Sequence, residues 1–430
     1  MRQHNPLRHL GAALGFMLAS AVGGCGGGSM DGSSMSPNPP PSAPPSGPST
    51  TAPPAVMQAQ QDNTPVDPAI VTADNTFGVN LFQNLYSATP GNVAIAPISV
   101  AMALQIVYNG AGGATQQGMA QTLQLGSLST QDLNNDNAAL QGSLMNPDPQ
   151  VNLTIANSLW MHLETNPLPA AFTQMDQTYY GATVGDLAGA PDNVNSWVNT
   201  ATNGLISSIL PPGNYASVVA VIANVIYFKG QWSTGFDASQ TAAAPFTLMD
   251  GTQVSVSMMH QSATYGYLQG ANFQAVRIPY GAGRFSMLAV MPNAGTNFNS
   301  FVAGLTPAML NTWEGQLQTV MGNLSMPKFT ATWGASLVQP LTALGMQAAF
   351  CPSASFPGLG TVCIQDVEHK TVVEVDESGT VAAGATTVTI IPTAVEAPSF
   401  TLALDQPFLY AIRDDMTGEL LFIGTMTNPS

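Results

Sequence analysis

Residues 218–228 read VVAVIANVIYF, a run in which Asn224 is the one polar side chain among ten apolar ones. β-Branched and aromatic residues dominate it, and both of its alternating faces are apolar. Strands with two apolar faces are covered on both sides, whereas strands at a surface alternate between apolar and polar residues. The run therefore predicts a buried strand.

Segments of both secondary-structure types surround this strand. The segment 249–260 is predicted to form a strand with Asp250–Gly251 as the turn at its entry. Further strands are predicted at 284–292 and near 409–412 and 420–424. Helical spacing appears on the face made by Phe77, Leu81, Phe82 and Leu85, again from Pro97 to the Asn109–Gly110 stop, and at 336–350 around Pro340. Helices and strands mix without βαβ regularity, so the expected fold class is α+β.

The N-terminal part of the chain reads as an export signal and a tether. Residues 1–24 begin with Arg2 and Arg8 and contain the apolar run LGAALGFMLASAV, which is too short to span a bilayer. The run leads into VGGC, which resembles the lipobox of bacterial lipoproteins and would make Cys25 the lipidated residue. The alternative is an ordinary signal peptide with a chance cysteine. Residues 25–70 are rich in Pro, Ser and Gly and are expected to form a tether, and 71–430 the folded domain.

This N-terminus predicts where the protein resides. We expect a bacterial, exported, lipid-anchored protein of the outer membrane, facing the periplasm or the cell surface, because Gly26 and no Asp follows Cys25. With Cys25 lipidated, Cys351 and Cys363 remain as an even pair. In an exported protein we expect them to form a disulfide.

Charge and motifs argue against several functions. The net charge is −16, and no cluster is formed by the few basic residues, so neither nucleic acid nor a heparin-type polyanion is an expected partner. No metal-ligand spacing, phosphate loop or nucleophile motif occurs, so neither metal nor cofactor is expected. His162 and His260 read as ordinary surface or edge residues. An enzyme is therefore the weaker hypothesis.

Six motifs in order give the chain a resemblance to the serpins, a family of serine protease inhibitors. They cover nearly all of residues 72–428 and read NVAIAPISVAMAL, VIANVIYFKGQW, LSMPKF, VEHKTVVEVDESGT, LALDQPFLYAI and LFIGTMTNP. The resemblance implies three β-sheets with eight or nine helices and an exposed reactive-centre loop. It also implies a monomer that acts as a suicide substrate: a serine protease attacks the loop, and the cleaved loop then inserts into the main sheet.

The reactive loop falls in the stretch VEVDESGTVAAGATTVTIIPTAVEA, residues 373–397. A linker is the alternative interpretation, but the apolar run 388–391 argues against it. In the reactive-loop interpretation, the hinge at the start of the loop is composed of Glu377, Gly379, Thr380, Ala382, Ala383, Gly384 and Ala385. On insertion the inward side chains would be small or uncharged, namely Thr380, Ala382, Gly384, Thr386, Val388 and Ile390. A charged hinge would instead suit a non-inhibitory binding protein at the cell surface, the second hypothesis.

Family spacing also suggests the bond that is cut. Counted from Glu377, it lies between Thr393 and Ala394; counted from the C-terminal side, it lies between Glu396 and Ala397. A small uncharged residue at the cut favours elastase-like or subtilisin-like proteases. Residues 371–412 contain no Lys or Arg, which disfavours trypsin-like ones.

The resemblance further implies a buried polar cluster, the shutter, under the point where the main sheet opens. Its members here would be Ser99, Asn224 and His369, with hydrogen bonds that hold the closed state. One departure is Ala96, where the family has a serine.

Overall fold

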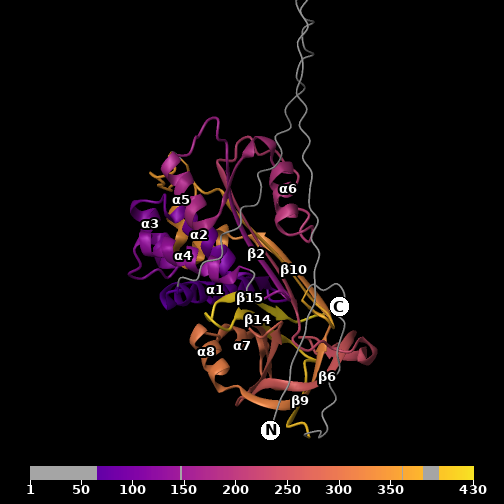
Figure 1. Ribbon diagram of the computed structural model, residues 1–430. Coiled ribbons are helices and arrows are strands. Elements are labelled where there is room, and N and C mark those ends of the chain that lie inside the picture. The colour runs from indigo at the N-terminus through magenta and orange to yellow at the C-terminus, as the bar shows by residue number, and fades with distance from the viewer. Residues whose placement is uncertain (1–64, 146–147, 361, 381–396) are drawn as a thin grey trace, which may run out of the picture. The chain divides into compact units, whose positions relative to one another are not determined.

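The computed structural model describes residues 65–145, 148–360, 362–380 and 397–430. In these residues the chain forms nine α-helices (Figure 1): α1 (Pro68–Ala88), α2 (Pro97–Tyr108), α3 (Gly113–Thr122), α4 (Thr130–Leu144), α5 (Ala170–Tyr180), α6 (Asp192–Ala201), α7 (Phe298–Ala303), α8 (Pro307–Gln316) and α9 (Val338–Leu341). The strands are β1 (Ala94–Ile95), β2 (Val151–Met161), β3 (Thr183–Asp186), β4 (Ala220–Gln231), β5 (Ala242–Thr247), β6 (Gln253–Gln269), β7 (Phe273–Tyr280), β8 (Phe285–Pro292), β9 (Gln318–Pro327), β10 (Phe329–Ser336), β11 (Asp366–Val375), β12 (Gly379–Thr380), β13 (Phe400–Ala403), β14 (Phe408–Asp414) and β15 (Leu420–Met426).

The run quoted first is the central strand β4 of a six-stranded sheet, as its composition predicts. The order in this sheet is β10-β11-β12-β4-β2-β3. β4 pairs with β2 along the whole length of β2, and it is parallel to β11. Strands distant in sequence therefore lie side by side at the middle of the sheet.

The remaining strands form a nine-stranded system that the long strand β6 holds together. One end of β6 pairs with β5, its middle with β9 and its other end with β7, from which the order continues through β8, β14 and β15 to β1. At the other edge, β13 pairs with β9. The described strands thus form one six-stranded and one nine-stranded sheet, which together with the helices confirm the expected α+β fold.

Helices cover both faces of the six-stranded sheet. On one face, Trp197 of α6 packs with its neighbours against Trp160 of β2 and Val221 of β4. On the other face lies α2, every residue of which is buried. This burial follows from its sequence, which is apolar almost all round, and it places α2 under the sheet's centre.

Two segments differ from the expectations. Helix α1 begins at Pro68, inside the range assigned to the tether, because the Asp67 side chain accepts a hydrogen bond from Ala69 N–H and caps the helix. The helix expected at 336–350 is broken: α9 is short, and Gly345 has a φ of 110°. No helix within the described parts of the chain is long and apolar enough to cross a membrane.

Candidate functional site

The six-stranded sheet is incompletely paired between β4 and β11. Direct pairing covers only residues 366–369 of β11, and its last pair is His369 with Asn224. Beyond it, residues 370–374 of β11 and 225–229 of β4 have no strand partner on their facing edges among the described residues. Peptide groups there are available to a strand that enters between them.

The hinge begins to fill this opening from its far end. The Asp376 side chain accepts hydrogen bonds from the N–H groups of Ser378 (2.9 Å) and Gly379 (3.2 Å), which turns the chain back on itself. Gly379 and Thr380 then form β12, which pairs with β4 on one side and with β11 on the other. Two hinge residues therefore already lie in the sheet.

Thr380 points into the core, as expected for the first inward residue of an inserting strand. Its side chain is buried, and its Oγ1 lies 2.7 Å from the hydroxyl of Tyr280. Tyr280 is fully buried and stacks on Trp232 with ring centroids 4.3 Å apart. Trp232 in turn donates from its backbone N–H to Ser378 O and from its indole N–H to Asp376 O, both at 2.9 Å. Trp232 and Tyr280 thus pack against the hinge and hydrogen-bond to it.

Glu377 anchors the same turn through its side chain. Its carboxylate accepts hydrogen bonds from Lys328 Nζ at 2.7 Å and from Thr241 Oγ1 at 2.8 Å. Burial alone would raise the pKa of Glu377, but the bonds from Lys328 and Thr241 outweigh it, and the pKa lies below its ordinary value. The hinge therefore carries an ionised anchor at its start, while its next residues are neutral.

The three predicted shutter residues lie together where the direct pairing of β4 and β11 ends. Ser99 of α2 donates to Asn224 of β4, whose amide donates to Asn157 of β2 at 2.6 Å. His369 of β11 accepts from Ala96 N–H at 3.1 Å through Nε2, so Nδ1 carries the proton of a neutral ring. Burial lowers the pKa of His369 from 6.5 to about 3.

Two shutter residues were missed from the sequence. Asn157 lies opposite Asn224, and Thr371 donates from its hydroxyl to Ala94 O at 2.7 Å. Asn157 carried only a weak signal, because the same strand also contains Asn152, Thr154 and Ser158. Thr371 carried none, because threonine is ordinary in a strand.

Other predicted positions can be placed or lie outside the described residues. Ala397 is exposed. His162 and His260 are half-buried, with hydrogen bonds to Tyr215 O and Ser325 Oγ. Positions outside the described residues are Cys25, Ala382, Ala383, Gly384, Ala385, Thr386, Val388, Ile390, Thr393, Ala394 and Glu396.

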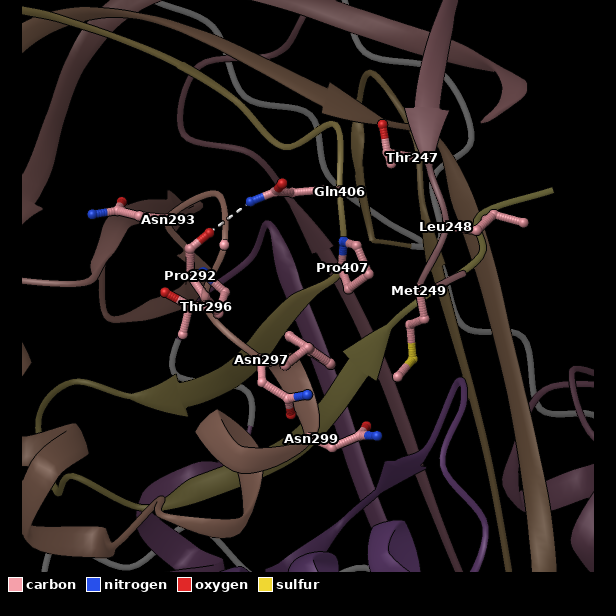
Figure 2. A pocket seen from close by; sticks show the side chains of 12 residues that line it. Thr247, Leu248, Met249, Pro292, Asn293, Thr296, Asn297, Asn299, Gln406 and Pro407 are labelled. Carbon is pink, nitrogen blue, oxygen red and sulfur yellow. Dashed lines mark hydrogen bonds between the residues drawn. The ribbon is translucent and has the colours of Figure 1, made fainter. Parts of the chain in front are cut away.

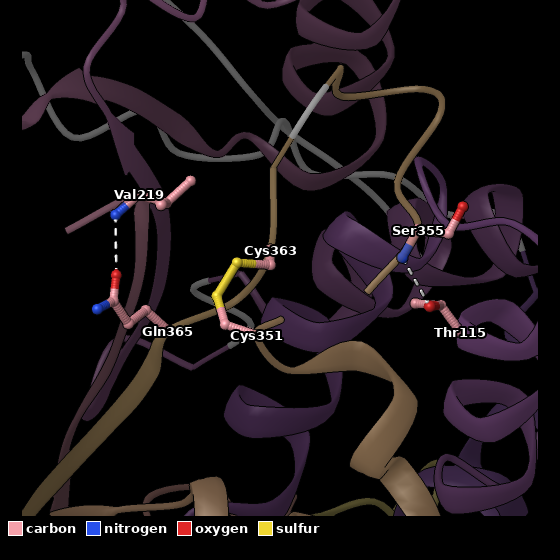
Figure 3. The surroundings of a disulfide bond; sticks show 6 residues. All are labelled: Thr115, Val219, Cys351, Ser355, Cys363 and Gln365. Carbon is pink, nitrogen blue, oxygen red and sulfur yellow. Dashed lines mark hydrogen bonds between the residues drawn. A yellow bond between two sulfur atoms is a disulfide. The ribbon is translucent and has the colours of Figure 1, made fainter. Parts of the chain in front are cut away.

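A disulfide joins Cys351 to Cys363, with their Cα atoms 5.1 Å apart (Figure 3). The loop that it closes is attached to the helical layer, because Ser355 N–H donates to Thr115 Oγ1 of α3 at 2.9 Å. Just after the disulfide, Gln365 accepts a hydrogen bond from the N–H of Val219, the residue before β4 (Figure 3). The disulfide thus fixes the chain that leads into β11.

One cavity away from the sheet opening has an uncharged lining. A pocket of about 250 Å³ lies between the start of α7 and the turn after β5 (Figure 2). It is lined by amides and apolar groups such as Asn297, Gln406 and Met249, and it contains no charged residue. The described residues contain no group of three or more His, Cys, Asp or Glu side chains suited to a metal ion.

The fold is α+β, and its six-stranded main sheet is open between β4 and β11, where Gly379 and Thr380 pair with both strands. The model of the family "Serpin (serine protease inhibitor)" matches residues 72–429. The chain therefore belongs to the serpin family, whose members are in general inhibitors of serine proteases and not catalysts.

Individual relatives agree with this assignment. Serpin-Z2A of Triticum aestivum is 31% identical over 82% of this chain and 94% of its own. Leukocyte elastase inhibitor of Bos taurus is 30% identical over 83% and 98%. Among solved structures, the native thermophilic serpin tengpin has a TM-score of 0.79 at 29% identity, covering 87% of this chain and 97% of its own.

Gly379 offers a test of the hinge geometry. A Cβ at this position would lie 2.0 Å from Gly230 O and 2.7 Å from the Cα of Gln231, both backbone atoms of β4. Gly379→Ala should expel the hinge from the sheet, lower the melting temperature by several degrees and change the tryptophan fluorescence of Trp232. At Gly213, in the segment before β4, the nearest atom would be a ring carbon of Tyr215 at 3.6 Å, so Gly213→Ala is the control and should change neither. Equal behaviour of the two variants would contradict the placement of β12.

Proposed function

We propose that this protein inhibits serine endopeptidases as a suicide substrate. The protease serine attacks the carbonyl carbon of the scissile bond, the new amine leaves, and the loop's N-terminal part stays esterified to the enzyme. This part then enters the main sheet as a strand and carries the protease with it. The observation that supports the proposal is the opening between β4 and β11, with Gly379 and Thr380 already at its end.

The energetics of strand addition are sufficient for such a rearrangement. Insertion pairs peptide groups along residues 225–229 and 370–374, which are unpaired on these edges in the described structure. Ladder hydrogen bonds contribute about 1 kcal/mol each, so about a dozen residues supply on the order of 10 kcal/mol. Strand addition to a sheet is a known mode of recognition, and serpin loop insertion is an example of it. A buried unpaired charge in the inserting strand would oppose it by several kcal/mol.

Thr380→Arg tests the insertion step. Arginine has no partner in the buried site beside Tyr280, so insertion should lose the race against deacylation. We expect the variant to be cleaved as a substrate, with several-fold more inhibitor consumed per protease inactivated and little SDS-stable adduct on a gel.

The matched control is Thr330→Arg on β10 of the same sheet, where the threonine is exposed. It should inhibit like the wild type. Unchanged trapping by the Thr380 variant would refute insertion. A wild type that forms no adduct with any serine protease would favour a non-inhibitory binding role, as in the similar thyroxine-binding globulin, solved in complex with thyroxine (27% identity, TM-score 0.76, 84% of this chain and 99% of its own covered).

We further propose Thr393–Ala394 as the scissile bond, because the hinge side of the loop is constrained by the sheet it must span. A small β-branched residue at the cut fits a shallow apolar pocket, so the proposed targets are elastase-like or subtilisin-like proteases. Neither nucleic acid nor a polyanion is proposed as a partner.

The cut is identified by the fragment released from the adduct. N-terminal sequencing of the small C-terminal fragment should begin at Ala394. A fragment that begins at Ala397 would move the cut to Glu396 and change the target to a glutamate-specific protease.

The cellular setting completes the proposal. We propose a bacterial monomer, exported and held by a lipid on Cys25 at the outer membrane, with residues 26–67 as a tether of Pro-rich composition. Such an anchor would keep the inhibitor at the cell that needs protection from proteases.

Mass spectrometry of the protein from its native membrane tests this setting. The expected N-terminal peptide starts at Cys25 and carries lipid, and no free thiol is found, since Cys351 and Cys363 are joined. Reduction before alkylation should label both of these cysteines. A mature N-terminus beyond Cys25, or labelling without reduction, would contradict the lipid anchor or the disulfide, respectively.

A further inference from the structure

Three fully buried carboxyl groups lack the partners that a carboxylate needs. Asp74 lies on α1, Asp176 on α5, and Glu419 directly before β15. Among the described residues, both oxygens of Asp176 and of Glu419 have no hydrogen-bond partner, and Asp74 has one on Oδ1 only. None of the ion pairs of the described chain includes them. Ionised carboxyl groups in such surroundings are strongly unfavourable.

The contact between Asp74 and Gln105 shows what would satisfy the first of them. Gln105 Nε2 donates to Asp74 Oδ1 at 2.8 Å. The other oxygen of each group, Asp74 Oδ2 and Gln105 Oε1, is buried without a partner. Both are acceptors if Asp74 is ionised. A proton on Oδ2 makes that oxygen a donor, and the acid and the amide can then form two complementary hydrogen bonds.

Asp176 lies in a second polar cluster that also contains no cation. Tyr180, one helical turn later, donates to Asn134 Oδ1 at 2.8 Å and accepts from Asn137 Nδ2 at 3.5 Å. Asn137 Oδ1 is buried without a donor among the described residues. The cluster thus has acceptors in excess, and a protonated Asp176 would supply a donor.

The charged groups around these acids are mostly acidic or already paired. Burial is the main cause that raises the pKa of Tyr180 and of Glu419. A charge on Asp74 would raise both further, and a charge on Asp176 would raise that of Tyr180, so ionisation of one acid disfavours ionisation of its neighbours. Among the described residues, Arg413 is the one cation that lowers the pKa of Glu419, whereas Asp414 raises it. The Arg413 guanidinium lies 3.4 Å from Asp415 and 3.9 Å from Glu314, and Asp414 pairs with Arg284 at 2.8 Å.

We propose that Asp74, Asp176 and Glu419 are neutral carboxylic acids in the folded protein, so that the helical layer behind the main sheet is a proton-binding site. Burial agrees with this assignment, since it raises the pKa of Asp74 and of Asp176 from 3.8 to about 7 and that of Glu419 well above 4.5. The site reaches the shutter, because α2 carries both Gln105 and Ser99.

The sign of the pH dependence follows from proton linkage. Between pH 3.8 and about 7 the folded protein keeps protons that the unfolded chain has released, so stability falls as pH rises through this range. For each aspartic acid the unfolding constant should rise by up to roughly a thousand-fold. His369 acts in the opposite direction, since its lowered pKa removes stability as pH falls from 6.5 to about 3. Differences between variants therefore isolate the acids.

Asp74→Asn is the decisive variant, because its amide can donate to Gln105 Oε1 as a protonated acid would. Relative to the wild type, its melting temperature should be unchanged at pH 4.5 and several degrees higher at pH 8. Asp176→Asn should behave in the same way. The control is Asp192→Asn at an exposed position of α6, which should show no pH-dependent difference. If Asp74→Asn is destabilised equally at both pH values, Asp74 acts as a carboxylate and the proposal is wrong.

Infrared spectroscopy gives a readout that needs no protease. A carboxylic acid C=O band should be present at pH 6 and weaken as the pH rises to 9. The band should be smaller in Asp74→Asn, since burial also raises the pKa of Glu368 to about 7 and that acid contributes to the wild-type band. Absence of the band at pH 6 would overturn the proposal. So would a rise in the wild-type melting temperature on adding millimolar Ca²⁺ or Mg²⁺ at pH 8 that Asp74→Asn lacks, because the oxygens would then bind a metal ion instead of protons.

Discussion

The arrangement of the molecule depends on the peptide N–H and C=O groups on the facing edges of β4 and β11, because such groups require hydrogen-bond partners. Direct pairing closes the sheet as far as His369 and Asn224, and β12 closes its other end. Between these points the sheet lacks a strand among the described residues. The helices, the shutter and the hinge anchor are arranged around a place in the sheet where peptide groups on both sides lack partners among the described residues.

Cations are scarce, and the interior relies on other polar contacts. Of the basic residues in the described part of the chain, Arg277, Arg284 and Arg413 share one network with Asp414 and Asp415. Lys328 holds the hinge. Few cations remain to pair with buried acids, so amides and hydroxyls surround them instead. A core of this kind depends on protons where other proteins use salt bridges.

Apolar periodicity and helix-start signals predicted elements whose formation depends on residues close together in the sequence. The strands near 218–228 and 284–292 and the helix after Pro97 follow from apolar periodicity and the proline at N1. The helix expected at 336–350 is broken where Gly345 adopts a conformation that glycine favours. The row Asn157, Asn224 and His369 depends on the register of strands far apart in sequence, which periodicity does not encode. The buried acids were not predicted because Asp and Glu side chains usually face water.

The contacts of Trp232 have an optical consequence. Its indole N–H is bonded to the carbonyl of Asp376, and its ring lies on Tyr280, whose hydroxyl contacts Thr380. Indole emission depends on the polarity and hydrogen bonding around the ring, so any displacement of the hinge alters the light that this side chain emits. The chain has five tryptophans, so a variant that keeps Trp232 alone would report the state of the sheet in real time without a label.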